Sequence, residues 1–403
     1  MNTYKIILKN EKYRQIFIIN IINVLGNSMS AVAIPIVISQ NKIGSSVIGM
    51  MMGIQSIIGV LIFLPQATFI EKQGEKKCLE IALFFNVVVY CLYSGCSQIT
   101  IGIGKFIEGI ADRLLNSVLS KVLYDETDGT NIRGKVNGIL NSITNIIYIA
   151  GPAIAYPLMR KSNRLVFSII AIFTLIGLLI LGNKSLLSLE KNRKNFSTRK
   201  VGFQELYREH FEKYKKNKFV KLITIPSVLF SSVDIFLSVL LNLYFIQSKG
   251  FVTEEIIILS IINAVIGIVF QVPSGILTDE NKEKSLFFSL IANMIGFLIL
   301  ILQHNHFVLY IGFIIMYLGL IQYTNTIAVR FGDYTSKENR LSEAESYRMI
   351  RACAEGLFSI ILSKIFDWNE VMCICIVYIC VCVGNVLAIF IEKRYNKSKR
   401  LIT

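Results

Sequence analysis

The chain has 403 residues, of which 53% are hydrophobic and 17% are charged, and its mean hydropathy is +0.57. Soluble domains contain roughly 45–50% apolar and about 25% charged residues. Runs such as 165–183 and 371–391 are too long and too apolar for the core helices of such a domain. The composition excludes a disordered chain and a soluble enzyme, and it indicates a polytopic α-helical membrane protein.

Twelve apolar segments have roughly the 17–25 residues needed to cross about 30 Å of hydrocarbon. They lie at 16–38, 45–69, 78–97, 99–120, 136–158, 165–183, 221–246, 255–277, 285–303, 306–329, 345–366 and 370–391. We therefore expect an all-α membrane protein with twelve transmembrane helices in two pseudosymmetric six-helix bundles. These bundles would be residues 1–183 and 221–403, joined by a cytoplasmic linker at 184–220.

The net charge of +15 arises mainly from basic residues in the termini and loops. The termini and even-numbered loops hold 32 of the 42 Lys and Arg residues, the odd-numbered loops hold 6, and the remaining 4 lie within spans. Because basic residues accumulate on the cytoplasmic side of a membrane, both termini are expected there. The excess of basic residues therefore indicates the membrane topology of the chain. We expect the lipid bilayer as a partner and no binding of nucleic acid.

Residues with catalytic or metal-binding potential are scattered. The eight cysteines form no CxxC pair, and His304 and His306 share one short loop. No GxxxxGK[ST] phosphate loop occurs. These patterns predict no enzyme, no metal site and no bound cofactor.

Polar side chains recur at helical spacing within the first bundle. Span 1 carries a stripe formed by Asn20, Asn23, Asn27 and Ser30. Span 4 carries Lys105, Glu108 and Asp112 on one helical face, followed by Arg113. This face is either a self-neutralising ladder, in which Lys105 and Glu108 pair, or a cavity wall on which Glu108 or Asp112 accepts a proton or meets a cationic substrate.

The linker and the repeat relate the two halves. In the linker, apolar residues at helical spacing predict an amphipathic helix on the membrane surface, namely Phe203, Leu206, Tyr207, Phe211 and Tyr214. A shift of 208 residues aligns 64–71 with 272–279 and Asp125 with Asp333, and each of these acids precedes a base, Arg133 or Arg340. Such repeats are typical of secondary transporters.

The second bundle also carries charges within its spans. Span 7 holds Asp234 on a stripe with serines and Asn242, and a salt bridge there would need another helix. In span 11 we expect Arg351 to pair with Glu355 at i, i+4, and Arg348 to contact Glu71 at the cytoplasmic end. Span 10 places Tyr310, Tyr317 and Thr324 on one face, which suits either a cavity for amphiphilic or cationic substrates or core packing.

The loops resemble those of the major facilitator superfamily, whose loop after span 2 follows G-x-L-x-D-R-x-G-R-K. Residues 67–76 keep an acid, a base and the turn glycine, which are Glu71, Lys72 and Gly74. The loop after span 8 keeps Gly275 and Asp279 and then departs from the pattern. In the family such acids pair with basic residues or helix ends of the opposite bundle when the inside gate is shut. The resemblance therefore implies that Glu71, Asp279, Arg133 and Arg348 hold or release this gate.

Span 5 resembles the antiporter motif G-x8-G-x3-G-P, which is usual in exporters of the family. Gly138, Gly151 and Pro152 match, whereas Ile147 replaces the middle glycine. In the family, spans 1, 4, 7 and 10 line the cavity. The resemblance therefore places the polar stripes of spans 1 and 7 there, with Asp234 as the first candidate for proton coupling and packing hydrogen bonds as the alternative.

We expect a monomeric, proton-coupled antiporter, similar to drug and macrolide efflux proteins, that exports small amphipathic compounds such as drugs, antibiotics or peptides by alternating access. The proton gradient would supply the energy, and the plasma membrane of a bacterium would hold the protein. Two alternatives stay open. One is import of a nutrient such as a sugar or a peptide, and the other is a transport-inactive receptor or lipid-handling protein.

Overall fold

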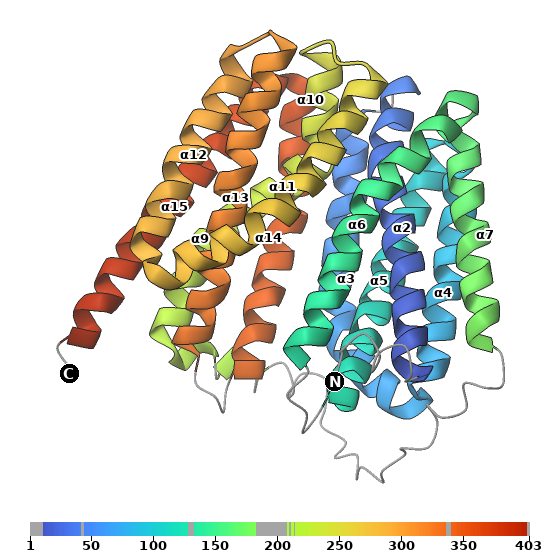
Figure 1. Ribbon diagram of the computed structural model, residues 1–403, viewed down its shortest axis with the longest axis horizontal. Coiled ribbons are helices and arrows are strands. Elements are labelled where there is room, and N and C mark those ends of the chain that lie inside the picture. Colours follow the sequence, from blue (N-terminus) through green and yellow to red (C-terminus); the bar gives the residue numbers. More distant parts are fainter. Residues whose placement is uncertain are drawn as a thin grey trace. The chain divides into compact units, whose positions relative to one another are not determined.

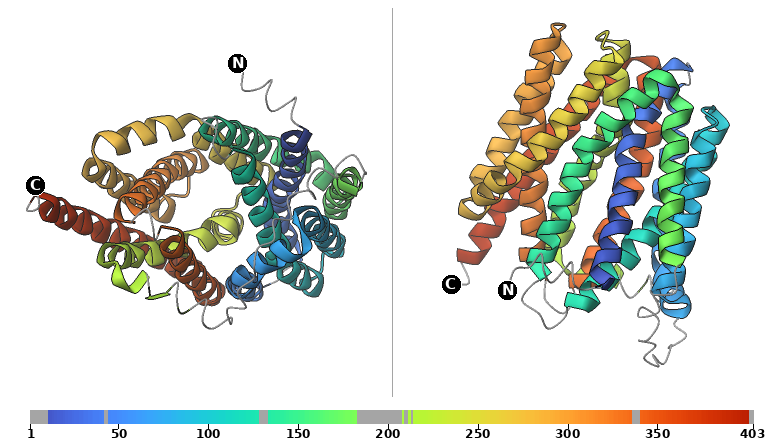
Figure 2. Two further views of the ribbon diagram at one scale, coloured as in Figure 1. Left: turned by 90° about the horizontal axis from the view of Figure 1, so that it is seen from below. Right: turned by 45° about the vertical axis from the view of Figure 1, so that its right-hand side comes forward.

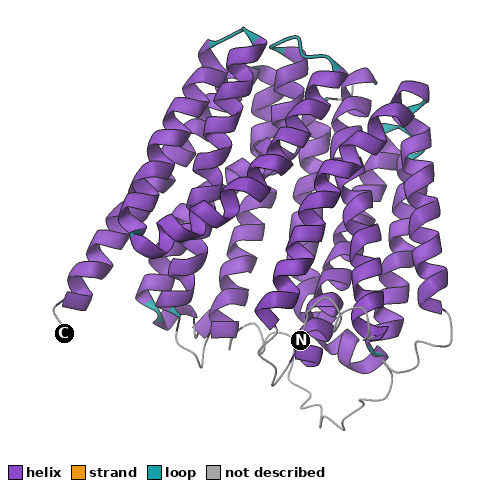
Figure 3. Cartoon of the chain, in the orientation of Figure 1, coloured by secondary structure: helices purple, strands orange, loops and turns teal. Residues whose placement is uncertain are grey.

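The computed structural model describes residues 11–41, 44–127, 133–182, 208, 211–212, 214–335 and 340–400. Within these ranges the chain is almost entirely helical and has no strand (Figure 3). Most of the linker expected at 184–220, with its amphipathic helix, lies outside the described residues.

Each predicted span coincides with one helix or one continuous helical segment (Figure 1). In the first half these are α2 (Glu11–Gln40), α3 (Ser45–Gln73), α4 (Glu75–Tyr93), α5 (Gln98–Thr127), α6 (Arg133–Lys161) and α7 (Asn163–Gly182). In the second half they are α9 (Lys218–Ile235), η2 (Phe236–Leu240), α10 (Leu241–Gln247), α11 (Thr253–Glu280), α12 (Lys282–Leu302), α13 (His306–Tyr334), α14 (Arg340–Trp368) and α15 (Glu370–Arg400). The all-α prediction is confirmed.

Seven segments, counted over the described residues, are long and apolar enough by themselves to cross a membrane. They are Phe17–Gln40, Asn163–Gly182, Lys218–Gln247, Thr253–Gln271, Lys282–Leu302, His306–Tyr334 and Glu370–Lys397. Helices α5 and α14 are not among them, and both carry the charges noted in spans 4 and 11. Such helices need partners inside the protein for these charges.

The chain forms two compact units, of which the first contains 1–43 and 58–201 and the second contains 44–57 and 202–403. Helix α3 therefore contributes its first residues to the second unit. There a Cβ added at Gly49 would collide with Ser363 of α14, and one added at Gly53 would lie 2.7 Å from the Gly356 carbonyl oxygen. Small residues permit this close packing. The boundaries expected from the sequence assigned 44–57 to the first bundle.

Apolar side chains and small residues hold each unit together. In the first, Leu79, Leu83 and Leu115 are buried in a cluster formed mainly by α4 and α5. In the second, α12 and α13, the two orange helices of Figure 2, lie side by side. A Cβ added at Gly319 of α13 would lie 2.8 Å from the Asn293 side chain of α12, so glycine allows the close approach.

Candidate functional site

An ion pair joins α9 and α14 within the second unit. Arg351 Nη2 donates to Asp234 Oδ2 at 2.6 Å, and the two side chains are 34% and 36% exposed. Asp234 lies just before the π-helical turn η2, and such turns are frequent at functional sites. Each side chain is the counter-ion of the other. The pair therefore avoids the cost of an unpaired charge inside a membrane.

The partner of Arg351 differs from the one expected. The helical spacing predicted a pair with Glu355, which lies one turn along α14 and within electrostatic reach. The guanidinium hydrogen-bonds to Asp234 instead. The stripe around Asp234 also contacts α14, because the buried Ser231 hydroxyl donates to the backbone oxygens of Ser227 at 3.2 Å and Arg351 at 3.5 Å.

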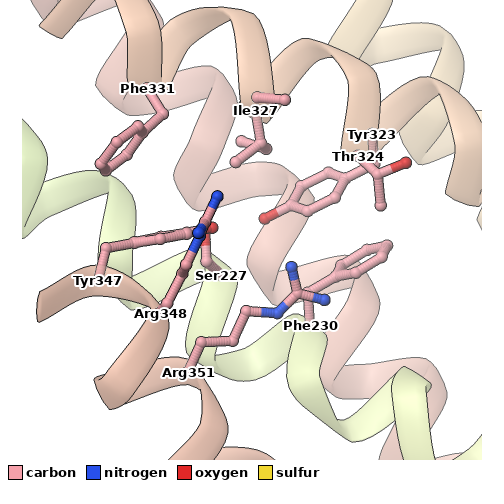
Figure 4. A pocket seen from close by; sticks show the side chains of 10 residues that line it. Ser227, Phe230, Tyr323, Thr324, Ile327, Phe331, Tyr347, Arg348 and Arg351 are labelled. Carbon is pink, nitrogen blue, oxygen red and sulfur yellow. The ribbon is translucent and has the colours of Figure 1, made fainter. Parts of the chain in front are cut away.

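A pocket of about 290 Å³ lies beside this ion pair, within the second unit (Figure 4). Its lining consists of two arginines, aromatic rings and small polar or apolar groups: Ser227, Phe230, Tyr323, Thr324, Ile327, Ala328, Phe331, Tyr347, Arg348 and Arg351. Phe230 and Tyr323 stack with centroids 3.8 Å apart, and the centroids of Phe331 and Tyr347 are 4.7 Å apart. The pocket is therefore cationic and aromatic.

The first unit contains a second polar cluster. Lys105 Nζ donates to Glu108 Oε2 at 2.5 Å, and the Tyr93 hydroxyl donates to the same oxygen at 3.0 Å. Glu108 is 5% exposed. Lys105 and Glu108 thus form the pair expected in the self-neutralising ladder. Lys105 hydrogen-bonds to Glu108 rather than to Asp112, the other acid on this face.

The stripe of span 1 faces this cluster. Asn86 donates to Asn23 Oδ1 at 3.1 Å, and the Tyr90 hydroxyl donates to Asn27 Oδ1 at 3.1 Å. Asp112 lies close to Asn27, and its Oδ1 is buried and has no hydrogen-bond partner. A buried carboxylate oxygen without a partner is costly, and a proton bound there would relieve that cost.

The remaining cavity candidate of span 10 packs against its own helix. Tyr317 stacks on Phe313 with centroids 5.9 Å apart. This contact is compatible with both packing and cavity lining. Thr324, from the same expected face, lines the pocket, as does the buried Tyr323.

The residues predicted to form the gate fall into two groups. For Glu71, Lys72, Asp125, Arg133, Arg340 and Gly138, the helical backbone is described but the side-chain environment lies outside the description. Gly74 has φ +83°, a left-handed conformation that favours glycine, at the turn between α3 and α4.

The other residues predicted to form the gate lie on the second unit. Gly275 has open space around it, and Asp279 is exposed near the end of α11. Asp333 pairs with Arg330 at 2.9 Å, and Arg330 also pairs with Glu392 of α15. Sequence reasoning missed Glu392, because it lies 62 residues from Arg330 and no local spacing links them.

Gly151 of the antiporter-like motif has a packing role. A Cβ added there would collide with the Ser28 hydroxyl of α2, and Gly151 and Pro152 are both buried. Close approach of α2 and α6 therefore requires glycine at this position whatever the direction of transport.

Among the described residues, no group of three or more His, Cys, Asp or Glu side chains could hold a metal ion.

Apolar helices that enclose ion pairs and a polar pocket define a membrane carrier as the class of protein. Residues 16–342 match the Major Facilitator Superfamily. The chain belongs to this family of non-enzymatic transporters, and it is an integral membrane protein.

Solved structures share the fold. A mutant of the nucleoside transporter NupG has a TM-score of 0.76 and 14% identity, over 93% of this chain and 97% of that one. A POT family transporter in complex with 5-aminolevulinic acid has a TM-score of 0.75 and 12% identity, over 94% and 96%. A mutant of the peptide transporter POT has a TM-score of 0.76 and 10% identity, over 94% of each chain. Among curated proteins, no sequence matches this chain.

Proposed function

We propose that this secondary transporter couples the inward movement of protons to the export of small amphipathic compounds by alternating access. The observation that carries the proposal is the Asp234–Arg351 ion pair beside the aromatic pocket. A proton on Asp234 would cancel its charge and free Arg351 within the pocket wall. Proton binding and ligand binding would then depend on each other, as coupling requires.

The carboxylates of the first unit are the second place for the proton. Asp112 has a buried oxygen without a hydrogen-bond partner, whereas Glu108 is held by Lys105 and Tyr93. We therefore rank Asp112 above Glu108 as a proton acceptor. Gating by Glu71, Asp279, Arg133 and Arg348, a monomeric state without cofactor, and a bacterial plasma membrane with cytoplasmic termini belong to the same proposal.

The test uses everted membrane vesicles with an acid interior, a panel of amphipathic dyes and antibiotics, and simultaneous readouts of substrate and interior pH. We expect substrate-dependent proton release from wild type, and its loss in Asp234→Asn or Asp112→Asn. Glu280→Gln, an exposed acid at the end of α11, is the matched control and should behave as wild type. Substrate movement without proton movement would contradict the coupling.

Import of a nutrient such as a sugar or a peptide is the second candidate. The observation that favours it is the likeness of the fold to a nucleoside transporter and a peptide transporter, while the packing of Gly151 against Ser28 holds for either direction of transport. Uptake of labelled sugars or dipeptides into right-side-out vesicles, with no efflux from everted ones, would replace the export proposal.

A further inference from the structure

We propose that the pocket of the second unit binds a small organic monoanion with a flat aromatic body, and that Arg348 holds its acidic group. This inference rests on the proposed transport function and names the class of compound that would be carried. It starts from the charges, rings and unsatisfied polar atom of the pocket lining.

The charge balance points to an anion. Of the ten lining residues, two carry a formal charge, and both are arginines. Arg351 is paired with Asp234 at 2.6 Å. Arg348 is exposed and lines the pocket, so its guanidinium is open to a ligand there. A guanidinium binds a planar carboxylate through two parallel hydrogen bonds.

The walls of the pocket suit a ring. Figure 4 shows Arg348 with Phe331 and Tyr347 on one side and Tyr323 on the other. Tyr323 is further fixed by stacking on Phe230, with an angle of 13° between the ring planes. An aromatic ligand body could stack on these rings while its acidic group reaches Arg348. The volume of about 290 Å³ lies near the lower end of ligand pockets, roughly 300–1,000 Å³, and favours a molecule of one or two rings.

An independent observation concerns the Tyr323 hydroxyl. The side chain is 2% exposed, and its oxygen is buried without a hydrogen-bond partner. Buried polar groups of proteins almost always have one. In Figure 4 this hydroxyl points toward the side of the pocket where Ser227 lies. Because this oxygen is inaccessible in the pocket as it stands, a ligand acceptor would partner it only after the Tyr323 side chain shifts toward the pocket.

The test measures binding to the full-length purified protein in lipid nanodiscs by isothermal titration. The probes are four arylalkyl acids, namely phenylacetate, 4-phenylbutyrate, 1-naphthylacetate and indole-3-acetate, each compared with its own carboxamide. We expect at least one acid to bind about tenfold or more tightly than its amide, the effect of one charge-assisted hydrogen bond. Equal binding within every pair, or no binding by any acid, would overturn the proposal.

Two substitutions assign the preference to Arg348. Arg348→Gln should reduce the difference between acid and amide to less than about twofold. Arg348→Lys should retain part of it, because the charge remains while the second parallel hydrogen bond is lost. Lys364→Gln removes one exposed charge from the same helix outside the pocket, and it should keep the full preference. Thermal unfolding checks that each variant is folded. An undiminished preference in folded Arg348→Gln would also overturn the proposal.

The outcome is separable from that of the transport proposal. Proton-coupled movement of neutral compounds in vesicles, without any preference for acids in the binding assay, would leave transport intact and refute the anion site. A preference for acids that depends on Arg348, without proton movement in vesicles, would retain the anion site and refute the coupling.

Discussion

At the scale of single residues, the pair of Asp234 and Arg351 links two helices that are far apart in sequence. Both side chains are about one third exposed, so solvent weakens their attraction, and the pair itself is expected to contribute about 1 kcal/mol or less to stability. Removing one partner should lower the stability by more than the pair contributes, because it leaves the other charge in the membrane without a counter-ion.

We therefore predict that Asp234→Ala or Arg351→Ala lowers the melting temperature of the purified protein more than the double substitution does. The measurement is a double-mutant cycle of thermal unfolding in detergent, with the interaction energy expected at about 0.5–3 kcal/mol. Additive effects of the two substitutions would mean that the charges do not interact in solution.

A second residue, Asp367, caps helix α3 within the second unit. Its carboxylate accepts hydrogen bonds from the Ser45 and Ser46 amides, both at 2.8 Å, and from the Ser45 hydroxyl at 2.6 Å. Burial raises the pKa of this carboxyl, but the hydrogen bonds from the two serines outweigh burial, and the pKa lies below its ordinary value. The ionised form is therefore the one that stabilises the folded protein.

We predict that Asp367→Ala destabilises the protein by about 0.5–2 kcal/mol, the usual cost of losing a helix cap. Because the folded pKa is the lower one, the contribution is complete above the unfolded value of about 3.9 and is lost as pH falls through the folded value. The melting temperatures of wild type and variant should thus differ equally at pH 7 and pH 5, and less at pH 3. A difference that shrinks between pH 7 and pH 5 would contradict this assignment.

At the scale of elements, the close approach of α2 and α6 depends on one glycine. We predict that Gly151→Ala lowers the unfolding free energy by about 1–3 kcal/mol, because the new Cβ meets the Ser28 hydroxyl. Gly267→Ala is the matched control, since it lies within α11 with nothing near its Cβ position, and it should leave stability unchanged or raise it by up to about 1 kcal/mol. Chemical denaturation in mixed micelles compares the two, and equal effects would refute the packing role.

The helices were largely predictable, because a membrane helix is recognised from the length and hydropathy of one short segment. Ion pairs between helices were not predictable in this way. Lys105 and Glu108 are three residues apart and share a face, so their contact follows from helical geometry. Asp234 and Arg351 are 117 residues apart, and no local rule favours that contact over Arg351 with Glu355. The π turn after Asp234 also has no proline or glycine to signal it.

At the scale of the whole molecule, the two halves share a layout but not their turns. The loop after α3 turns at Gly74 with φ +83°, whereas the loop after α11 uses Asn281 in an extended conformation. Asn281 accepts from the Lys284 amide and caps α12. Under the shift of 208 residues Gly74 aligns with Lys282, so the repeat keeps the turn to within one residue and replaces its chemistry.

The distribution of basic residues predicts the orientation of the whole chain. With 32 of the 42 Lys and Arg residues at the termini and even-numbered loops, the positive-inside rule predicts that both termini are cytoplasmic. A green fluorescent protein fused to the C-terminus should fluoresce in a bacterial host, and alkaline phosphatase at the same point should be inactive. Phosphatase fused after His304, in the short connection between α12 and α13, should be active, since an odd-numbered loop lies outside. The reverse pattern of activities would place most of the basic residues outside and overturn the topology on which the direction of transport depends.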